Sequence, residues 1–243
     1  MTTPILEHDH TSQAIRKRLG EPKTASYLRD WVYGGIDGAI TTFAIVAGVV
    51  GANLSPLVIL ILGFANLLAD GFSMAAGNYS ATKTEIDEYN QFREIEERHI
   101  DLVPEGEREE LRQILREIGL DGSTLEDATT AISSNKEKWI SLMLSQEYGL
   151  ATAQRDPIRS ALGTFCAFVI CGFVPLVPFL FAIPNAFVVS IVATGLVFVL
   201  IGSLKAKWSV TAWWVSALET LAIGAIAAAV AYYVGKFLEG FVS

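Results

Sequence analysis

The chain has 243 residues, of which 51% are hydrophobic and 18% are charged, and its mean hydropathy is +0.41. This balance is too apolar for an ordinary soluble domain and too charged for a protein that lies wholly within a membrane. The formal net charge of −8 arises within residues 83–160, which hold 18 of the 26 acidic and 10 of the 18 basic residues. Such local acidity argues against nucleic acid as a partner and favours cations.

Residues 1–31 are a polar tail without the apolar core and small-residue cleavage site of a signal peptide. The basic residues of this tail favour an amphipathic helix on the membrane surface, and a disordered segment is the alternative. Residues 32–53 form the first hydrophobic segment. Gly34 and Gly38 make a GxxxG pattern there, which is a weak signal for close helix packing in lipid.

A carboxylate, Asp70, lies inside the second hydrophobic segment, which runs from Leu57 to about Tyr79. A charge buried in lipid costs about 2.5 to 3.5 kcal/mol on insertion scales, so such residues are functional-site candidates by default. Asn66, Asp70 and Met74 are spaced i, i+4, i+8 and share one helix face. Together these side chains offer two kinds of oxygen and a thioether sulfur, a set of ligands that suits a transition metal. The alternative interpretation is that Asp70 is a polar residue that helps helices pack and that Met74 belongs to the core.

Asp37, in the first hydrophobic segment, is the second intramembrane carboxylate and the expected companion of Asp70. The second segment passes without a stop signal into good helix formers, so one long helix is predicted to leave the membrane. It opens the acidic insert, residues 83–160, which has the composition of a soluble helical region. Pro104 separates this first helix from a second one that ends at Gly119 or Gly122.

A third helix of the acidic insert is predicted to open at a capping box, Ser123 to Glu126, and to end near Gly149. Glutamate pairs at i, i+3 destabilise a helix unless a cation neutralises them, so the pairs in the insert favour a bound divalent cation. The alternative interpretation is that they form an acidic face exposed to solvent. The candidate metal ligands of the insert are Glu94, Glu97, Glu107, Glu110, Met143 and Glu147. His99 completes an E-x-x-H motif with Glu96, but di-iron bundles use two such motifs, so His99 is expected to be exposed or an accessory ligand.

Three further hydrophobic segments follow, at about Ala161–Ala182, Ala186–Leu204 and Ala212–Val234. Pro175 and Pro178 are expected to kink the first of them, since neighbours in a membrane can satisfy the freed carbonyls. Four regions are therefore predicted: the tail at 1–31, the first two transmembrane helices at 32–82, the acidic insert at 83–160 and the last three transmembrane helices at 161–243.

Lysine and arginine gather in the tail, in the acidic insert and at Lys205 and Lys207, and the loops at 51–56 and 183–185 have none. The positive-inside rule places the N-terminus and the insert in the cytosol and the C-terminus on the opposite side. No organelle-targeting extension is evident, so a bacterial inner membrane is expected.

Two stretches together make the chain resemble the vacuolar iron transporter family: DGAITTFA at 37–44 and ANLLADGFSM at 65–74. The similarity covers nearly the whole chain beyond the tail, including five spans with an acidic insert between the second and third. By position, the resemblance assigns Asp37 and Met74 to the intramembrane ligands of the family and the six candidates of the insert to its cytosolic metal-binding module.

This sequence departs from the family pattern at two positions. Leu144 stands where some members carry a second methionine, and Asn66 stands where plant-type members carry a glutamate. The acid here is Asp70, one turn later, as in microbial-type members.

The resemblance implies an all-α membrane protein that exports Fe(II), and often Mn(II), from the cytosol in exchange for protons. It implies a homodimer with the ion path near the two-fold axis, lined by the first and second helices. The metal ions are substrates, and neither a prosthetic cofactor nor an enzymatic activity is expected. The residues leave one rival open, a membrane-anchored metal-binding or ferroxidase module whose spans only anchor the insert. The roles of Glu85 and Glu219 stay open.

Overall fold

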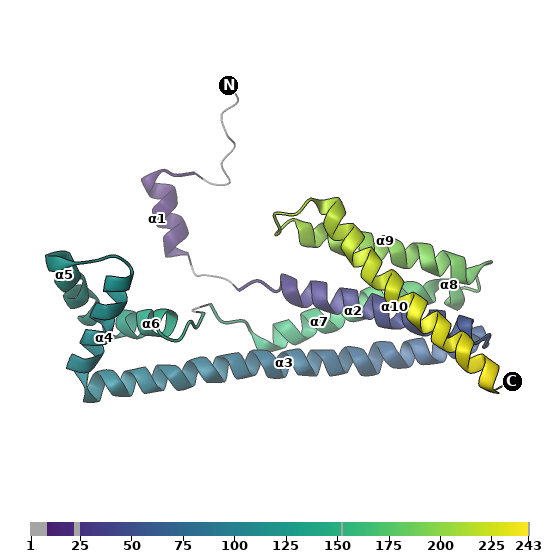
Figure 1. Ribbon diagram of the computed structural model, residues 1–243, viewed down its shortest axis with the longest axis horizontal. Coiled ribbons are helices and arrows are strands. Elements are labelled where there is room, and N and C mark those ends of the chain that lie inside the picture. Colours follow the sequence, from purple (N-terminus) through teal and green to yellow (C-terminus); the bar gives the residue numbers. More distant parts are fainter. Residues whose placement is uncertain (1–8, 22–24, 152, 243) are drawn as a thin grey trace, which may run out of the picture.

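The computed structural model describes residues 9–21, 25–151 and 153–242, and within these ranges it is built of helices without a strand. The helices are α1 (Ser12–Gly20), α2 (Leu28–Gly51), α3 (Pro56–Leu102), α4 (Pro104–Glu117), α5 (Gly122–Ser133), α6 (Lys136–Gln146), α7 (Pro157–Phe173), the 3-10 turn η1 (Val174–Leu176), α8 (Val177–Leu180), α9 (Ala186–Ala206) and α10 (Trp213–Val242). The all-α prediction is confirmed. Figure 1 shows α3 along the length of the molecule, with α4, α5 and α6 at one end and α2, α7, α9 and α10 beside the other.

Five helical segments of the described chain are long and apolar enough to cross a membrane: α2, α3, α7 with α8, α9 and α10. The five predicted spans are thereby confirmed. The 47 residues of α3 reach about 70 Å at 1.5 Å per residue, more than twice the roughly 30 Å of a hydrocarbon core. The predicted single helix that continues out of the membrane is therefore present.

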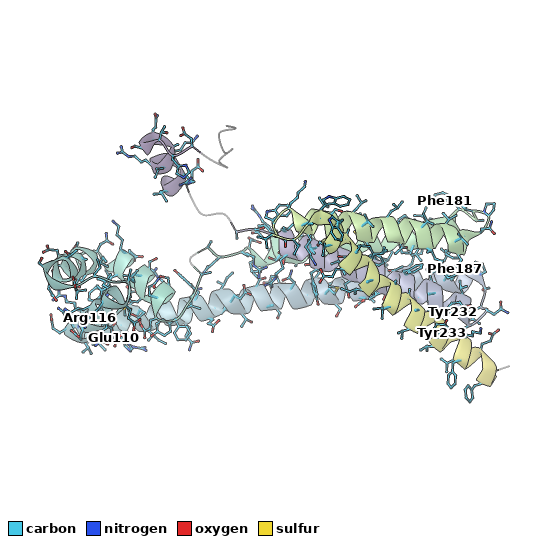
Figure 2. All side chains as sticks on the ribbon, turned by 45° about the horizontal axis from the view of Figure 1, so that its top comes forward. Glu110, Arg116, Phe181, Phe187, Tyr232 and Tyr233 are labelled. Carbon is cyan, nitrogen blue, oxygen red and sulfur yellow. The ribbon has the colours of Figure 1, made fainter. Side chains whose placement is uncertain are left out.

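Aromatic side chains gather at the end of the molecule opposite the acidic insert. Figure 2 places Phe181, Phe187, Tyr232 and Tyr233 there, and Glu110 with Arg116 at the insert end. Phe181 and Tyr233 are largely exposed. Exposed aromatic residues of this kind are typical of a membrane–water interface.

The centre of the helical bundle is α2, which contacts both α7 and α10 closely through glycine. A Cβ added at Gly38 would meet the backbone carbonyl of Phe168 on α7, and one added at Gly51 would meet that of Tyr232 on α10. The GxxxG pattern at Gly34 and Gly38 thus marks the interface with α7, as predicted for close packing in lipid.

Gly38→Ala is expected to lower the stability of the protein by about 1 to 3 kcal/mol, because the added methyl overpacks a backbone-to-backbone contact that cannot yield. Thermal unfolding in detergent would measure the loss. Gly77→Ala is the matched control, since a Cβ at Gly77 meets no atom within 4 Å. Equal melting temperatures for the two variants would contradict the close approach of α2 and α7.

The third span is kinked where Pro175 and Pro178 interrupt it, as predicted. The helix narrows to the 3-10 turn at Val174–Leu176 and resumes as α8. The hydroxyl of Ser190 on α9 donates a 2.8 Å hydrogen bond to the carbonyl of Pro175, so a neighbouring helix does satisfy a carbonyl of the kink. Asn185 then adopts φ of 56°, in the left-handed region that asparagine tolerates, and turns the chain into α9.

The acidic insert differs from prediction in its last part. One helix was expected from Ser123 to about Tyr148, but two helices, α5 and α6, occupy this stretch. Asn135 separates them because its side chain accepts a 3.0 Å hydrogen bond from the Lys138 amide and caps a new helix. The predicted capping box is also wrong: α5 begins at Gly122 after Asp121, and Glu126 pairs with Arg112 instead.

Candidate metal path and acidic cluster

Polar side chains join α2 to α3 along one line. The Asn66 amide donates hydrogen bonds to Thr41 Oγ1 at 3.2 Å and to Thr42 Oγ1 at 3.4 Å. The next link lies twelve residues, or about 18 Å, further along α3. There the Asn78 amide donates a hydrogen bond to Asp30 Oδ1 at 3.0 Å. The two helices therefore run antiparallel in a register that these bonds define.

Asp37 and Asp70 lie along α2 and α3 between these two links and are close enough to interact electrostatically. The structure thus brings together the two intramembrane carboxylates that the sequence singled out. Asn66, Asp70, Met74 and Asn78 follow one another at four-residue intervals on α3, and all four are half-buried. We call this line, with Asp30 and Asp37 on α2, the polar seam.

Asp30 is a member of the seam that sequence reasoning missed, because it was assigned to the polar tail. It is 2% exposed and lies at the start of α2. The Asn78 amide that binds it also donates to the Ser160 carbonyl at 3.2 Å and to Thr164 Oγ1 at 2.7 Å. A signal was present in the sequence, since Asp30 and Asp37 are seven residues apart and share a helix face.

A second group of acids lies in the insert, where α3, α4 and the end of α6 meet. Glu96 on α3 is 1% exposed and Glu107 on α4 is 4% exposed. The Tyr148 hydroxyl donates a 2.9 Å hydrogen bond to Glu96 Oε1, and His99 Nδ1 lies 3.4 Å from Glu107 Oε1. The Oε2 atoms of Glu96 and Glu107 are buried without a hydrogen-bond partner. Buried acids in this condition need a cation or a proton.

The electrostatics of this group show how strongly its charges repel one another. Burial, and then the negative charges of Glu96, Glu110 and Glu147, raise the pKa of Glu107 to about 7. Burial and the charge of Glu96 also raise the pKa of Glu147. We call Glu96, His99, Glu107, Glu110, Glu147 and Tyr148 the acidic cluster.

The six predicted ligands of the insert do not all reach this cluster. Glu107, Glu110 and Glu147 do, and Met143 is fully buried one turn before Glu147, in the apolar core of the insert. Glu94 is exposed, and Glu97 forms a 3.4 Å ion pair with Lys136. The structure therefore brings Glu96 and His99 to the cluster, and not Glu94 and Glu97.

The reason is the helical phase of α3. Tyr89, Phe92 and Ile100 pack into the core of the insert, and Glu96 is in phase with them. Glu94 points about 160° away from Glu96 around the helix axis, given 100° per residue. Phe92 and Ile100, four residues before and after Glu96, are apolar, and this spacing could have indicated from the sequence that Glu96 faces the core. His99, expected to be exposed or accessory, is half-exposed and beside Glu107.

The donor chemistry of the cluster, carboxylates with an imidazole, suits Fe(II) and Mn(II). Within the described ranges, however, no group of three or more His, Cys, Asp or Glu side chains is arranged to hold a metal ion. The cluster side chains would have to rotate toward a common point to bind one.

Two acids whose roles were open have basic partners. Glu85 on α3 accepts from Arg155, with Oε2 at 3.1 Å from the guanidinium. Glu219 on α10 forms a 3.0 Å ion pair with Lys205 on α9, and both side chains are exposed. An exposed pair of this kind contributes about 0 to 1 kcal/mol.

The raised pKa of Glu107 predicts that this residue destabilises the metal-free protein as pH rises. Its folded-state pKa of about 7 lies above the ordinary 4.5, so the folded state holds the proton more tightly than the unfolded chain does. That stabilisation is complete below the ordinary pKa and is lost as pH rises through the folded-state value. A bound cation would replace the proton, so stabilisation by Mn(II) should grow over the same interval.

Thermal unfolding at several pH values, with and without Mn(II), would measure both effects. Glu107→Gln should reduce the pH dependence and the effect of Mn(II) together. Glu109→Gln, at an exposed position on the same helix, is the matched control and should behave as the unsubstituted protein does. A Glu107→Gln profile that follows the unsubstituted protein at every pH would contradict the assignment.

Comparison with known proteins adds independent information. Residues 28–236 match the VIT family model. The chain is 34% identical over 218 residues to vacuolar iron transporter 1 of Arabidopsis thaliana, covering 87% of this chain and 86% of that protein. It is 32% identical over 215 residues to vacuolar iron transporter 2 of Oryza sativa, covering 87% of each. It is 30% identical over 248 residues to a vacuolar iron transporter of Toxoplasma gondii, covering 95% of this chain and 82% of that protein. The family match spans every membrane segment and the insert between them, and the chain belongs to the VIT family.

Proposed function

We propose that this membrane protein exports Fe(II), and also Mn(II), from the cytosol in exchange for protons. The observation that carries the proposal is the Asp37–Asp70 pair, two carboxylates that interact within the apolar spans of α2 and α3. Acids in such a place are costly unless they serve an ion path. The relatives named vacuolar iron transporter supply the choice of iron.

Competition between metal and protons supports antiport as the mechanism. A carboxylate must be deprotonated to bind a metal ion, so the Asp37–Asp70 pair can hold either the ion or protons. An acidic compartment on the far side would protonate the pair and release the ion. The half-buried thioether of Met74 lies one turn from Asp70 on the same face and favours a transition metal over Mg²⁺ or Ca²⁺.

The acidic cluster is proposed to collect the ion before it enters the membrane. Its buried acids carry the negative charge that would concentrate divalent cations from the cytosol. This role assigns the insert, with the N-terminus, to the cytosolic side and the C-terminus to the opposite side. The positive-inside distribution supports that orientation, and a bacterial inner membrane is the host membrane that we propose.

A homodimer is part of the proposal, because the seam lies next to uncovered apolar surface. Leu68 and Phe72, on the same helix as Asp70, are 63% and 69% exposed. A second copy packed on this face would bring two Asp37–Asp70 pairs toward one axis and enlarge the set of oxygen donors.

Metal uptake into proteoliposomes tests the function directly. The full-length protein would be reconstituted with a pH-sensitive dye inside an acidic lumen, and Fe(II) or Mn(II) would be added outside. Metal entry with matching alkalinisation of the lumen would support proton-coupled export. Metal bound by the protein without any entry would overturn it and favour the membrane-anchored metal-binding module.

A further inference from the structure

A cavity between α2 and α9 combines basic, aromatic and apolar side chains. It has a volume of about 690 Å³ and is lined by the segment before α2, by the first turns of α2, and by the end of α9 with the turn that follows it. Figure 1 shows the start of α2 and the end of α9 at the end of the bundle nearer the acidic insert. The cavity is open on one side, since Tyr33 and Trp208 in its wall are 62% and 66% exposed.

The packing of α9 against α2 defines the depth of the charged residues in this cavity. A Cβ added at Gly35 would lie 3.3 Å from Cδ1 of Ile201, so these two positions are level with each other. From there Lys205 lies about 6 Å along α9 and Arg29 about 9 Å along α2, both toward the open end of the bundle nearer the insert. Asp37, the only acid among the described residues of the lining, lies about 12 Å deeper along α2 than Arg29.

The outer part of the cavity is therefore basic. Arg29 and Lys205 lie there together with Ser26 and Ser209. Arg29 has no acidic partner among the residues that the structure describes. The Lys205 ammonium donates one 3.0 Å hydrogen bond to Glu219 and retains two further N–H groups for another acceptor. A guanidinium and an ammonium group at one level are suited to bind the oxygens of a phosphate group.

The wall beneath the basic residues is apolar. Leu28, Val32 and Ile36 follow one another at four-residue intervals on one face of α2. Tyr33 and Trp208 border the open side, and such amphipathic rings are typical of the level where lipid headgroups meet the acyl chains. A ligand that matches the whole cavity needs an anionic head and an apolar body, and a phospholipid has both.

We propose that this cavity binds an anionic phospholipid, with the phosphate group between Arg29 and Lys205 and the glycerol and upper acyl chain against Val32 and Ile36. Basic pockets between transmembrane helices bind the headgroups of anionic lipids in this way. The positive charge at the mouth disfavours a divalent cation there, and the carboxylate of Asp37 lies well below the level of the phosphate. The inference goes beyond the proposed function and does not rest on metal transport.

Fluorescence quenching by brominated lipids tests the site, because Trp208 borders it. The full-length protein would carry Trp31→Phe, Trp213→Phe and Trp214→Phe, which leaves Trp208 at the cavity. Trp139 also remains, but it is 3% exposed in the core of the insert and contributes a constant background. The protein would be reconstituted in mixtures of phosphatidylcholine and phosphatidylglycerol in which one lipid is brominated on its acyl chains. The dependence of quenching on lipid composition gives the relative binding constant of the two lipids beside Trp208.

The relative binding constant should favour phosphatidylglycerol. Arg29→Gln and Lys205→Gln should each reduce this preference by about fivefold, which corresponds to about 1 kcal/mol for a basic residue near the membrane surface. Lys207→Gln is the matched control, because Lys207 is an exposed lysine just after α9 that does not line the cavity. It should leave the preference unchanged. Melting temperatures of the three variants would check their folds.

Four results would overturn the proposal. Equal binding of the two lipids beside Trp208 would exclude a site for an anionic headgroup. Equal losses in Lys207→Gln and Arg29→Gln would replace the site by a general attraction of the basic surface. Absence of quenching by either lipid would show that protein, such as a second copy of the chain, covers this face. Displacement of brominated phosphatidylglycerol by inorganic phosphate at constant ionic strength would assign the site to free phosphate.

The quenching result is independent of the proposed function. Loss of the lipid preference together with metal uptake by the unsubstituted protein would remove the lipid site and leave transport intact. Failure of metal uptake would remove the transport function, whatever the quenching shows.

Discussion

Asp37→Asn is expected to reduce proton-coupled metal transport by at least about 100-fold, because it removes a proposed metal ligand, and loss of a group that only supports a ligand already costs 10- to 100-fold. Asparagine has nearly the volume of aspartate, so the contacts of α2 with α7 and α10 should survive. The variant retains an amide oxygen, but it can neither carry the negative charge that balances the cation nor take up a proton. The measurement is metal entry and lumenal alkalinisation in the proteoliposome assay.

The fold of the Asp37→Asn variant is checked by its melting temperature in detergent, which should stay close to that of the unsubstituted protein. Asp87→Asn is the matched control, since Asp87 is an exposed acid on α3 that pairs with Lys83. It should leave transport unchanged. Normal transport by Asp37→Asn would remove the polar seam from the mechanism.

Glu96→Gln is expected to weaken metal binding by the acidic cluster by at least about tenfold, the lower bound for loss of a group that orients or binds a metal. Glu96 is buried, interacts with both Glu107 and Glu147, and accepts from Tyr148. Titration calorimetry with Mn(II) would measure the affinity. The full-length protein would carry Asp37→Asn, so that binding at the intramembrane pair does not contribute.

Glu94→Gln is the control that separates the structure from the simple spacing argument. Glu94 lies two residues earlier on the same helix and is exposed, so its substitution should leave the affinity for Mn(II) unchanged. In transport, Glu96→Gln should slow metal entry at low metal concentration without abolishing it, because in the proposed mechanism the cluster only collects ions and the seam carries them across the membrane. A larger loss of Mn(II) affinity in Glu94→Gln than in Glu96→Gln would contradict this assignment and favour the pair Glu94 and Glu97 that the sequence suggested.

The elements that could be predicted from sequence are those that depend on composition along a single helix. The five spans follow from apolar runs, and the length of α3 follows from the absence of a stop signal after Tyr79. The kink at Pro175 follows from a missing amide hydrogen. Asn135 shows the limit of this reasoning, because its side chain starts a new helix where helix propensity alone predicted continuation.

The candidate sites divide in the same way. Asp37 and Asp70 could be named in advance because a carboxylate within an apolar span is costly wherever the helices lie. Whether Asp37 and Asp70 lie near each other depended on the register of α2 against α3, which the hydrogen bonds of Asn66 and Asn78 define. In the insert, E-x-x-E spacing could not distinguish Glu94 from Glu96, since both lie in a run of acids on one helix.

The sequence by itself determined that this chain is a helical membrane protein with acids inside its spans and an acidic insert between the second and third, because hydropathy and charge act locally along the chain. Only the tertiary structure decided which acids meet. Burial of Glu96 depends on how α3 is rotated against α4 and α6, and the bonds from Arg155 to Asp30 and Glu85 join residues that are 125 and 70 positions apart. Contacts over such separations are set by the packing of whole helices, which no local pattern of residues encodes.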